Sequence, residues 1–105
     1  MVTMEAIQAL TDRIAREFHP DRIILFGSYA DGAPRSDSDV DLLMVVPFDG
    51  NSLRYASSVL RRVNPPFAVD LLVRTPEQIR QRIEWGDQFL QEITERGKVL
   101  HEAAT

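Results

Sequence analysis

The chain of 105 residues contains no cysteine and only two histidines. The absence of cysteine excludes both a disulfide framework and a thiolate zinc site. Any bound metal must therefore be held by oxygen ligands or by His19 and His101, which lie far apart and lack the spacing of a ligand pair.

Positive charge and long apolar runs are also scarce. Twelve Lys and Arg residues oppose sixteen Asp and Glu residues, so the formal net charge is −4. This sign excludes general nucleic-acid binding through broad phosphate neutralisation. The longest apolar run, residues 42–48, contains Pro47 and falls far short of the roughly 20 residues that span a membrane. No basic cluster precedes an apolar segment near the N-terminus, so we expect no secretory signal and a cytoplasmic protein.

The pattern of apolar residues predicts an α/β (α+β) fold in one domain covering residues 1–105, with helices over a small mixed sheet. We expect helices over 4–18, 53–63 and 76–96, strands over 22–26, 40–46 and 67–73, and a tail or edge strand at the end. Thr3 and Ser52 are the expected N-caps of the first two helices, and the third opens with a capping box at Thr75 and ends at Gly97.

Gly27 and Ser28 directly follow the first predicted strand. Glycine allows close approach of the backbone, and amides at the start of a short helical turn favour an anion such as a phosphate. Arg35, in the same loop, is a further candidate for phosphate contact. A Gly-Ser pair alone is more often only a turn, and a loop arginine is more often only exposed.

Three aspartates are the candidate catalytic groups. Asp39 and Asp41 are two residues apart at the entrance to the second predicted strand, so both carboxylates point to the same side. Asp70, in the third predicted strand, joins them if that strand pairs beside the second. Clustered carboxylates repel one another and suit Mg²⁺ or Mn²⁺, and with a phosphate site nearby they indicate nucleotidyl or phosphoryl transfer with two metal ions. Asp70 would ligate the second ion and is a candidate base, although alone it could be an edge residue or a partner of Arg74.

The aromatic residues leave several alternatives open. Tyr29 or Tyr55 could stack on a nucleotide base. Trp85 and Phe89 have an i,i+4 spacing and could be core or an interface anchor, and their exposure would favour an interface, including one between copies of this chain.

Residues 24–42, which contain Gly27-Ser28 and Asp39-Val40-Asp41, resemble the signature of the polymerase-β-like nucleotidyltransferase superfamily. With Val69-Asp70-Leu71 and the order of elements, the chain is similar more narrowly to the minimal nucleotidyltransferases. The resemblance implies a polymerase-β-like palm in which Gly27 and Ser28 bind the phosphates of ATP. It also implies that Asp39, Asp41 and Asp70 hold two Mg²⁺ ions, with Asp70 favoured as the base.

The resemblance also implies a partner. Proteins of this family and size are commonly antitoxins that act beside a HEPN-type toxin ribonuclease, and they resemble enzymes that transfer AMP from ATP to a tyrosine of that toxin. Two other classes stay open. One is a nucleotidyltransferase for small molecules, such as aminoglycosides, and the other is an antitoxin that neutralises its partner by binding alone.

Overall fold

The structure, a computed structural model, describes residues 1–104 as eight elements around one sheet. These are α1 (Met4–Phe18), β1 (Arg22–Phe26), β2 (Val40–Val45), α2 (Ser52–Val63), β3 (Val69–Arg74), α3 (Pro76–Glu84), α4 (Gln88–Arg96) and β4 (Lys98–Glu102). The four strands lie in the order β3-β2-β1-β4, with β2 and β3 parallel and the other neighbours antiparallel. This mixed sheet confirms the predicted α/β class.

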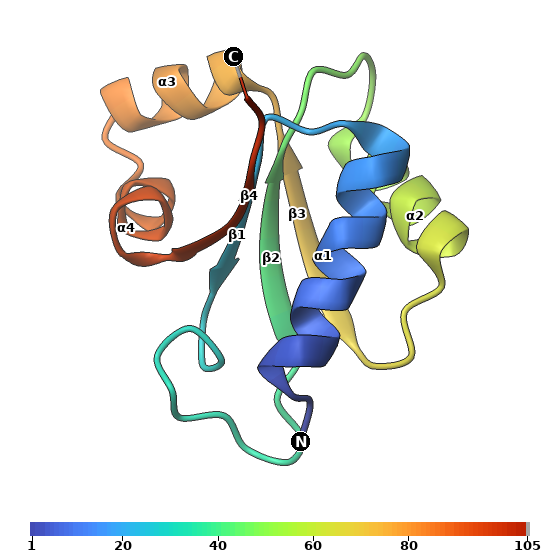
Figure 1. The fold of residues 1–105 in the computed structure, drawn as a ribbon. Helices are drawn as coiled ribbons and strands as arrows, with labels where there is room; N and C mark the ends of the chain where they lie inside the picture. Colours follow the sequence, from blue (N-terminus) through green and yellow to red (C-terminus); the bar gives the residue numbers. More distant parts are fainter. Residues whose placement is uncertain (105) are drawn as a thin grey trace.

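Helices cover both faces of the sheet: α1 and α2 pack on one face, and α3 and α4 on the other (Figure 1). Side chains of β2 alternate between these two layers. Leu42 and Met44 join the cluster beneath α1 and α2, whereas Leu43 and Val45 join the cluster beneath α3 and α4. Burial on both faces explains why the central strands are almost continuously apolar. Among residues 1–104, none of the helices combines the length and apolar character needed to cross a membrane.

Two helix starts show what local sequence can and cannot decide. The Thr3 side chain accepts a hydrogen bond from the amide of Ala6, as an N-cap should. The predicted cap at Ser52 is wrong, because Asn51 caps α2 and accepts from the amides of Leu53 and Arg54. Asn and Ser are nearly equal as caps, so the sequence alone does not choose between neighbours.

The bounds of two strands differ from the prediction. The third strand begins at Val69 rather than at residue 67 and ends at Arg74. The second strand ends at Val45 rather than at residue 46.

The single helix predicted over residues 76–96 is wrong, because the chain breaks it into α3 and α4. Gly86 adopts φ +92°, a conformation that interrupts a right-handed helix. Asp87 then caps α4 by accepting a hydrogen bond from the amide of Leu90 at 3.0 Å. Trp85 and Phe89 consequently do not share one helix face, and both are exposed, by 74% and 57%. Neither is a core residue.

The end of the described chain forms the edge strand β4, which pairs antiparallel with β1. As predicted, the preceding helix ends at Gly97. A Cβ atom at Gly97 would collide with the side chain of Ile24 and the carbonyl of Ile93. Glycine therefore lets α4 turn closely into β4 against the sheet.

Replacing Thr11 by valine should raise the free energy of unfolding by about 1 kcal/mol, because the Thr11 hydroxyl is buried in α1 without a hydrogen-bond partner among the described residues. Urea denaturation measures the change. Thr94→Val is the matched control, since its hydroxyl donates to the carbonyl of Gln91 at 3.0 Å and its removal should give no gain. A loss of stability in Thr11→Val would contradict the expectation.

Candidate active site

The predicted site residues gather at one end of the sheet, the lower end in Figure 1, where β1 ends and where β2 and β3 begin. The parallel register places Asp41 directly beside Asp70, and the antiparallel register places Asp41 beside Phe26. The pairing on which the sequence prediction depended, between the second and third strands, is therefore present. It brings together two acids that lie 29 positions apart in the chain.

The carboxylates of Asp41 and Asp70 face the layer of α3 and α4. Asp41 lies two residues before Leu43, and Asp70 two residues before Leu72, and both leucines pack in that layer. Asp41 is partly buried, whereas Asp39 and Asp70 are exposed. Of the alternatives for Asp70, the edge residue is therefore confirmed, because β3 is an edge strand of the sheet and leaves it open to solvent.

Asp70 does not form the alternative pair with Arg74. None of the three ion pairs found within residues 1–104 includes either side chain. Arg74 is four residues further along β3, which corresponds to about 13 Å in an extended strand.

Asp41 is the acid whose ionised form this end of the sheet disfavours. Burial raises the pKa of the Asp41 carboxyl above its usual value, and the neighbouring charges of Asp70 and then Asp39 raise it further. The three acids are thus electrostatically coupled. A cation at this place would relieve their repulsion.

The donor set fits a hard divalent cation, because carboxylate oxygens are the ligands that Mg²⁺ and Mn²⁺ prefer. As the side chains are arranged, no group of three or more His, Cys, Asp or Glu residues in the described chain could hold a metal ion. Like charges favour rotamers that keep the carboxylates apart, so the side chains of Asp39, Asp41 and Asp70 must rotate toward one another to share an ion.

The turn after β1 touches the acids. Gly27 has φ +74°, and a Cβ atom there would collide with the carboxylate of Asp41. In this turn the amide of Asp31 donates to the carbonyl of Gly27, and the amide of Ala33 donates to that of Ser28, both at 3.0 Å. The amides at positions 28–30 have no backbone acceptor within the described chain. The candidate phosphate donors and the candidate metal ligands therefore lie next to each other.

The remaining predicted contact, Arg35, lies in the exposed loop between this turn and β2. Its backbone amide donates to the Ser38 hydroxyl at 2.8 Å, which shapes the loop. The role of its guanidinium in phosphate binding stays a prediction, as do the roles of Ser28 and the three acids.

A cavity of about 330 Å³ adjoins the turn, between the end of β1 and α4. Gly27 and Asp31 line one side, Phe89 and Arg96 line the other, and the rings of Phe26 and Phe89 meet edge to face at 5.8 Å. Sequence reasoning missed Phe26 and Arg96 as candidate contacts. No local signal could have found Arg96, because the break between α3 and α4 decides where α4 lies, and Phe26 borders the cavity through its contact with Phe89 of the same helix.

Neither tyrosine offers a stacking surface at this site. Tyr29 is buried, and its hydroxyl accepts a hydrogen bond from the amide of Val2 at 3.1 Å. Tyr55 lies on α2 and stacks on Phe48 in the opposite layer. The Phe26 and Phe89 pair is the aromatic surface that borders the turn.

Comparison with known proteins gives three kinds of similarity. The family described as "Nucleotidyltransferase domain" matches residues 7–103. A protein of Methanocaldococcus jannaschii named "Putative protein adenylyltransferase MJ0604" is 33% identical over 84 residues, which cover 76% of this chain and 77% of that protein.

Two solved structures share the fold. A toxin–antitoxin crystal structure with AMP-PNP has a TM-score of 0.60 at 21% identity and covers 91% of this chain and 73% of that one. A mutant of the toxin–antitoxin MntA-HpeT has a TM-score of 0.58 at 18% identity, with the same coverage of 91% and 73%. Identities this low establish the fold alone.

Proposed function

The chain belongs to the nucleotidyltransferase domain family and is a nucleotidyltransferase, and on this premise we propose that it transfers AMP from ATP to a hydroxyl of a partner protein. The observation that carries the proposal is the contact between the Gly27 turn and Asp41, which stands in register with Asp70. This contact sets a phosphate-binding turn against a cluster of acids. Nucleotidyl transfer requires both at one place.

In the proposed reaction, different residues of this chain have different roles. The free amides at positions 28–30 bind phosphate oxygens, and the absent side chain of Gly27 leaves room for the Asp41 carboxylate directly against this turn. Asp39, Asp41 and Asp70 would hold Mg²⁺, which when bound neutralises phosphate charge and lowers the pKa of the acceptor hydroxyl. The acceptor oxygen attacks the α-phosphorus, the bond to pyrophosphate breaks, and the exposed Asp70 takes the proton of the hydroxyl.

The open position of the acids favours a protein as the acceptor. Asp39 and Asp70 are exposed at an end of the sheet where β3 forms the edge, so an acceptor can approach on a protruding side chain. The name of the Methanocaldococcus jannaschii relative and the toxin–antitoxin structures support the same class. We propose that the partner is a toxin, of the HEPN type by the resemblance of the sequence, that the acceptor is a tyrosine, and that the transfer makes this chain an antitoxin.

Incubation of the protein with ATP, Mg²⁺ and the product of the adjacent gene should add one or more AMP units to that product. Intact-mass analysis detects the gain, and omission of Mg²⁺ should abolish it. A stable complex without any gain would contradict the enzymatic proposal and indicate neutralisation by binding. If neither forms, turnover of ATP with aminoglycosides tests for a small-molecule acceptor.

A further inference from the structure

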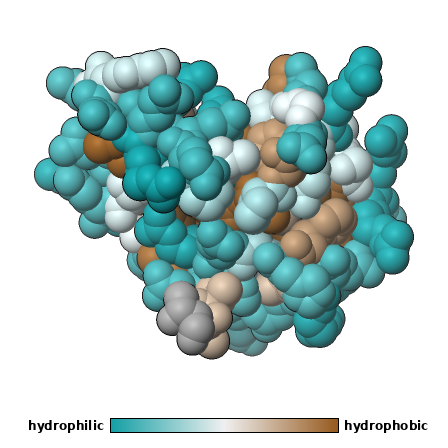
Figure 2. Space-filling model, turned by 90° about the horizontal axis from the view of Figure 1, so that it is seen from above, coloured by the Kyte–Doolittle hydropathy of each residue, from teal (hydrophilic) through white to brown (hydrophobic). Residues whose placement is uncertain are grey.

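A second cavity, of about 250 Å³, lies at the end of the sheet opposite to the acids, between the start of α2 and helix α3. We call it the distal cavity, and it is lined by Ser52, Arg74, Gln78, Gln81, Arg82 and Trp85. Seen from this end, the surface is hollowed between the part that α3 and α4 build and the rest of the molecule (Figure 2). The proposed transfer reaction uses none of these residues.

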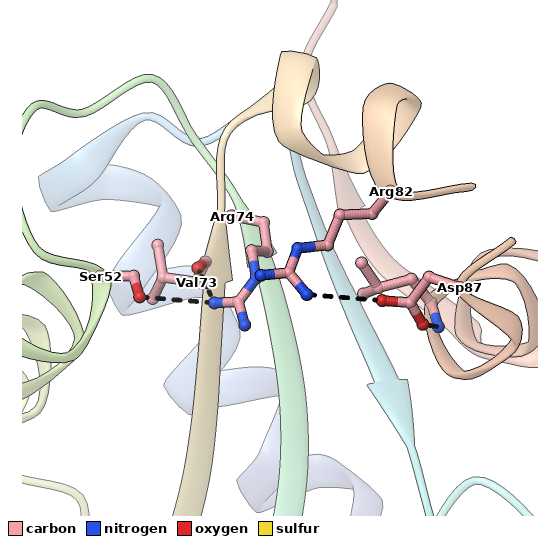
Figure 3. A network of polar contacts seen from close by, with 6 residues as sticks. Ser52, Val73, Arg74, Arg82 and Asp87 are labelled. Carbon is pink, nitrogen blue, oxygen red and sulfur yellow. Dashed lines mark hydrogen bonds and ion pairs between the residues drawn. The ribbon is translucent and has the colours of Figure 1, made fainter. Parts of the chain in front are cut away.

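Arg74 is the central side chain of the distal cavity. Its Nη1 donates to the carbonyl of Val73 at 2.7 Å and lies 3.4 Å from the Ser52 hydroxyl (Figure 3). Its Nε is buried and has no hydrogen-bond partner within residues 1–104, and no carboxylate in that range pairs with it. A half-buried guanidinium without an acidic partner costs free energy, and an acceptor bound beside it would lower that cost.

A second guanidinium, that of Arg82, adds positive charge beside Arg74. Arg82 points into the same region from α3 (Figure 3), and its positive charge, after the effect of burial, lowers the pKa of Arg74. Asp87 faces both arginines and partly compensates them. Its Oδ2 lies 3.7 Å from Arg82, while its Oδ1 caps α4 through the amide of Leu90. Two cations therefore share one carboxylate that is already engaged.

The start of α2 adds a third favourable contribution. This helix has 12 residues, and its first turn carries no acidic side chain. Its positive dipole end lies beside Arg74, and only the neutral cap Asn51 compensates it. An anion that accepts several hydrogen bonds suits this place. It would be favoured by the helix end, by the two guanidinium groups and by the Ser52 hydroxyl.

We propose that the distal cavity is a second ligand site, which binds a phosphate group through Arg74 and Arg82. A phosphate dianion matches two guanidinium groups better than a single carboxylate does, and its oxygens can accept hydrogen bonds from both of them. The cavity has room for a substituent, and the exposed ring of Trp85 could cover it. The same chemistry fits inorganic phosphate and a phosphate ester. About 13 Å of β3 separates this site from Asp70.

Trp85 is the one tryptophan in the sequence and reports on this cavity directly. Its fluorescence should change saturably when the protein is titrated with inorganic phosphate or glycerol phosphate, without divalent metal and at constant ionic strength. Acetate should give no saturation. Tighter binding of glycerol phosphate than of inorganic phosphate would identify an ester as the source. A response to acetate with the same midpoint as phosphate, or no saturable response to either phosphate, would overturn the proposal.

Variants of the two arginines test whether the change in Trp85 fluorescence arises from binding at the distal cavity. Arg82→Gln and Arg74→Gln should each weaken phosphate binding by about tenfold or more, because each removes a charged hydrogen-bond donor. Arg82 is half exposed, so its replacement should leave the fold intact, as far-UV circular dichroism can verify. Arg80→Gln is the matched control, since Arg80 lies on the same helix, is 71% exposed, and within residues 1–104 pairs only with Glu77. Equal binding by Arg82→Gln and Arg80→Gln would contradict the assignment.

Discussion

Asp41→Asn is expected to lower nucleotidyl transfer by about 10³-fold or more while the protein remains folded, because neutralisation of phosphate charge by a metal ion is worth several kcal/mol. Asp41 is the acid that contacts the Gly27 turn and stands in register with Asp70, so its oxygens link the phosphate and metal contacts. Asparagine keeps the shape of the side chain but removes the charge on which the cation depends.

The Asp41→Asn variant should remain folded because of the electrostatics of the site. Burial and the charges of Asp70 and Asp39 raise the pKa of Asp41, which means that the folded protein disfavours its ionised form. A neutral asparagine removes this repulsion. The thermal unfolding midpoint in the absence of divalent metal should therefore be no lower than that of the wild-type protein.

Asp49→Asn is the control for this variant, because it removes the same charge from an exposed loop away from the acids. It should transfer AMP at the wild-type rate. Initial rates at saturating ATP and Mg²⁺ measure both proteins. If Asp41→Asn kept more than about a tenth of the activity, the residue would not be a metal ligand.

The sequence predicted those elements that are specified by short-range signals such as apolar spacing and helix caps. Helix α1 with its cap at Thr3 and strand β1 formed as expected, and β2 formed one residue shorter than expected. The break at Gly86 was missed because glycine inside a periodic stretch is tolerated in many helices. Only packing of Ile79, Leu90 and Ile93 on the sheet shows that α3 and α4 must turn relative to each other.

The candidate site was predicted in its members but not in its arrangement. Spacing placed Asp39 and Asp41 on one side of a strand, but the pairing of Asp41 with Asp70 depends on how the chain returns through α2. Strand register between distant segments follows from the whole pattern of burial rather than from any short motif. For the same reason the distal cavity, where the ends of β3, α2 and α3 meet, has no signature in the sequence.

Gly27→Ala is expected to abolish transfer and to destabilise the protein more than an ordinary glycine replacement does. The left-handed backbone at Gly27, φ +74°, already costs an L-residue about 1–2 kcal/mol. The added Cβ would also collide with the Asp41 carboxylate, so either the turn or the acid must move away from its partner. Both movements separate the proposed phosphate-binding amides from the proposed metal ligands.

Gly32→Ala separates these two effects. Gly32 has nearly the same φ, +77°, but a Cβ atom there would meet nothing within 4 Å. It should therefore show the cost of backbone strain without the collision, and it should retain transfer. Urea denaturation and initial rates of the two variants measure the difference.

A double-mutant cycle identifies the colliding group. Removal of the carboxylate in Asp41→Ala should recover part of the stability lost in Gly27→Ala, because the new methyl group then has space, while activity stays absent without the metal ligand. Strictly additive changes in the free energy of unfolding would show that Gly27 and Asp41 do not meet. A coupled cycle would instead show that glycine is required at position 27 because the Asp41 carboxylate occupies the volume of its missing side chain.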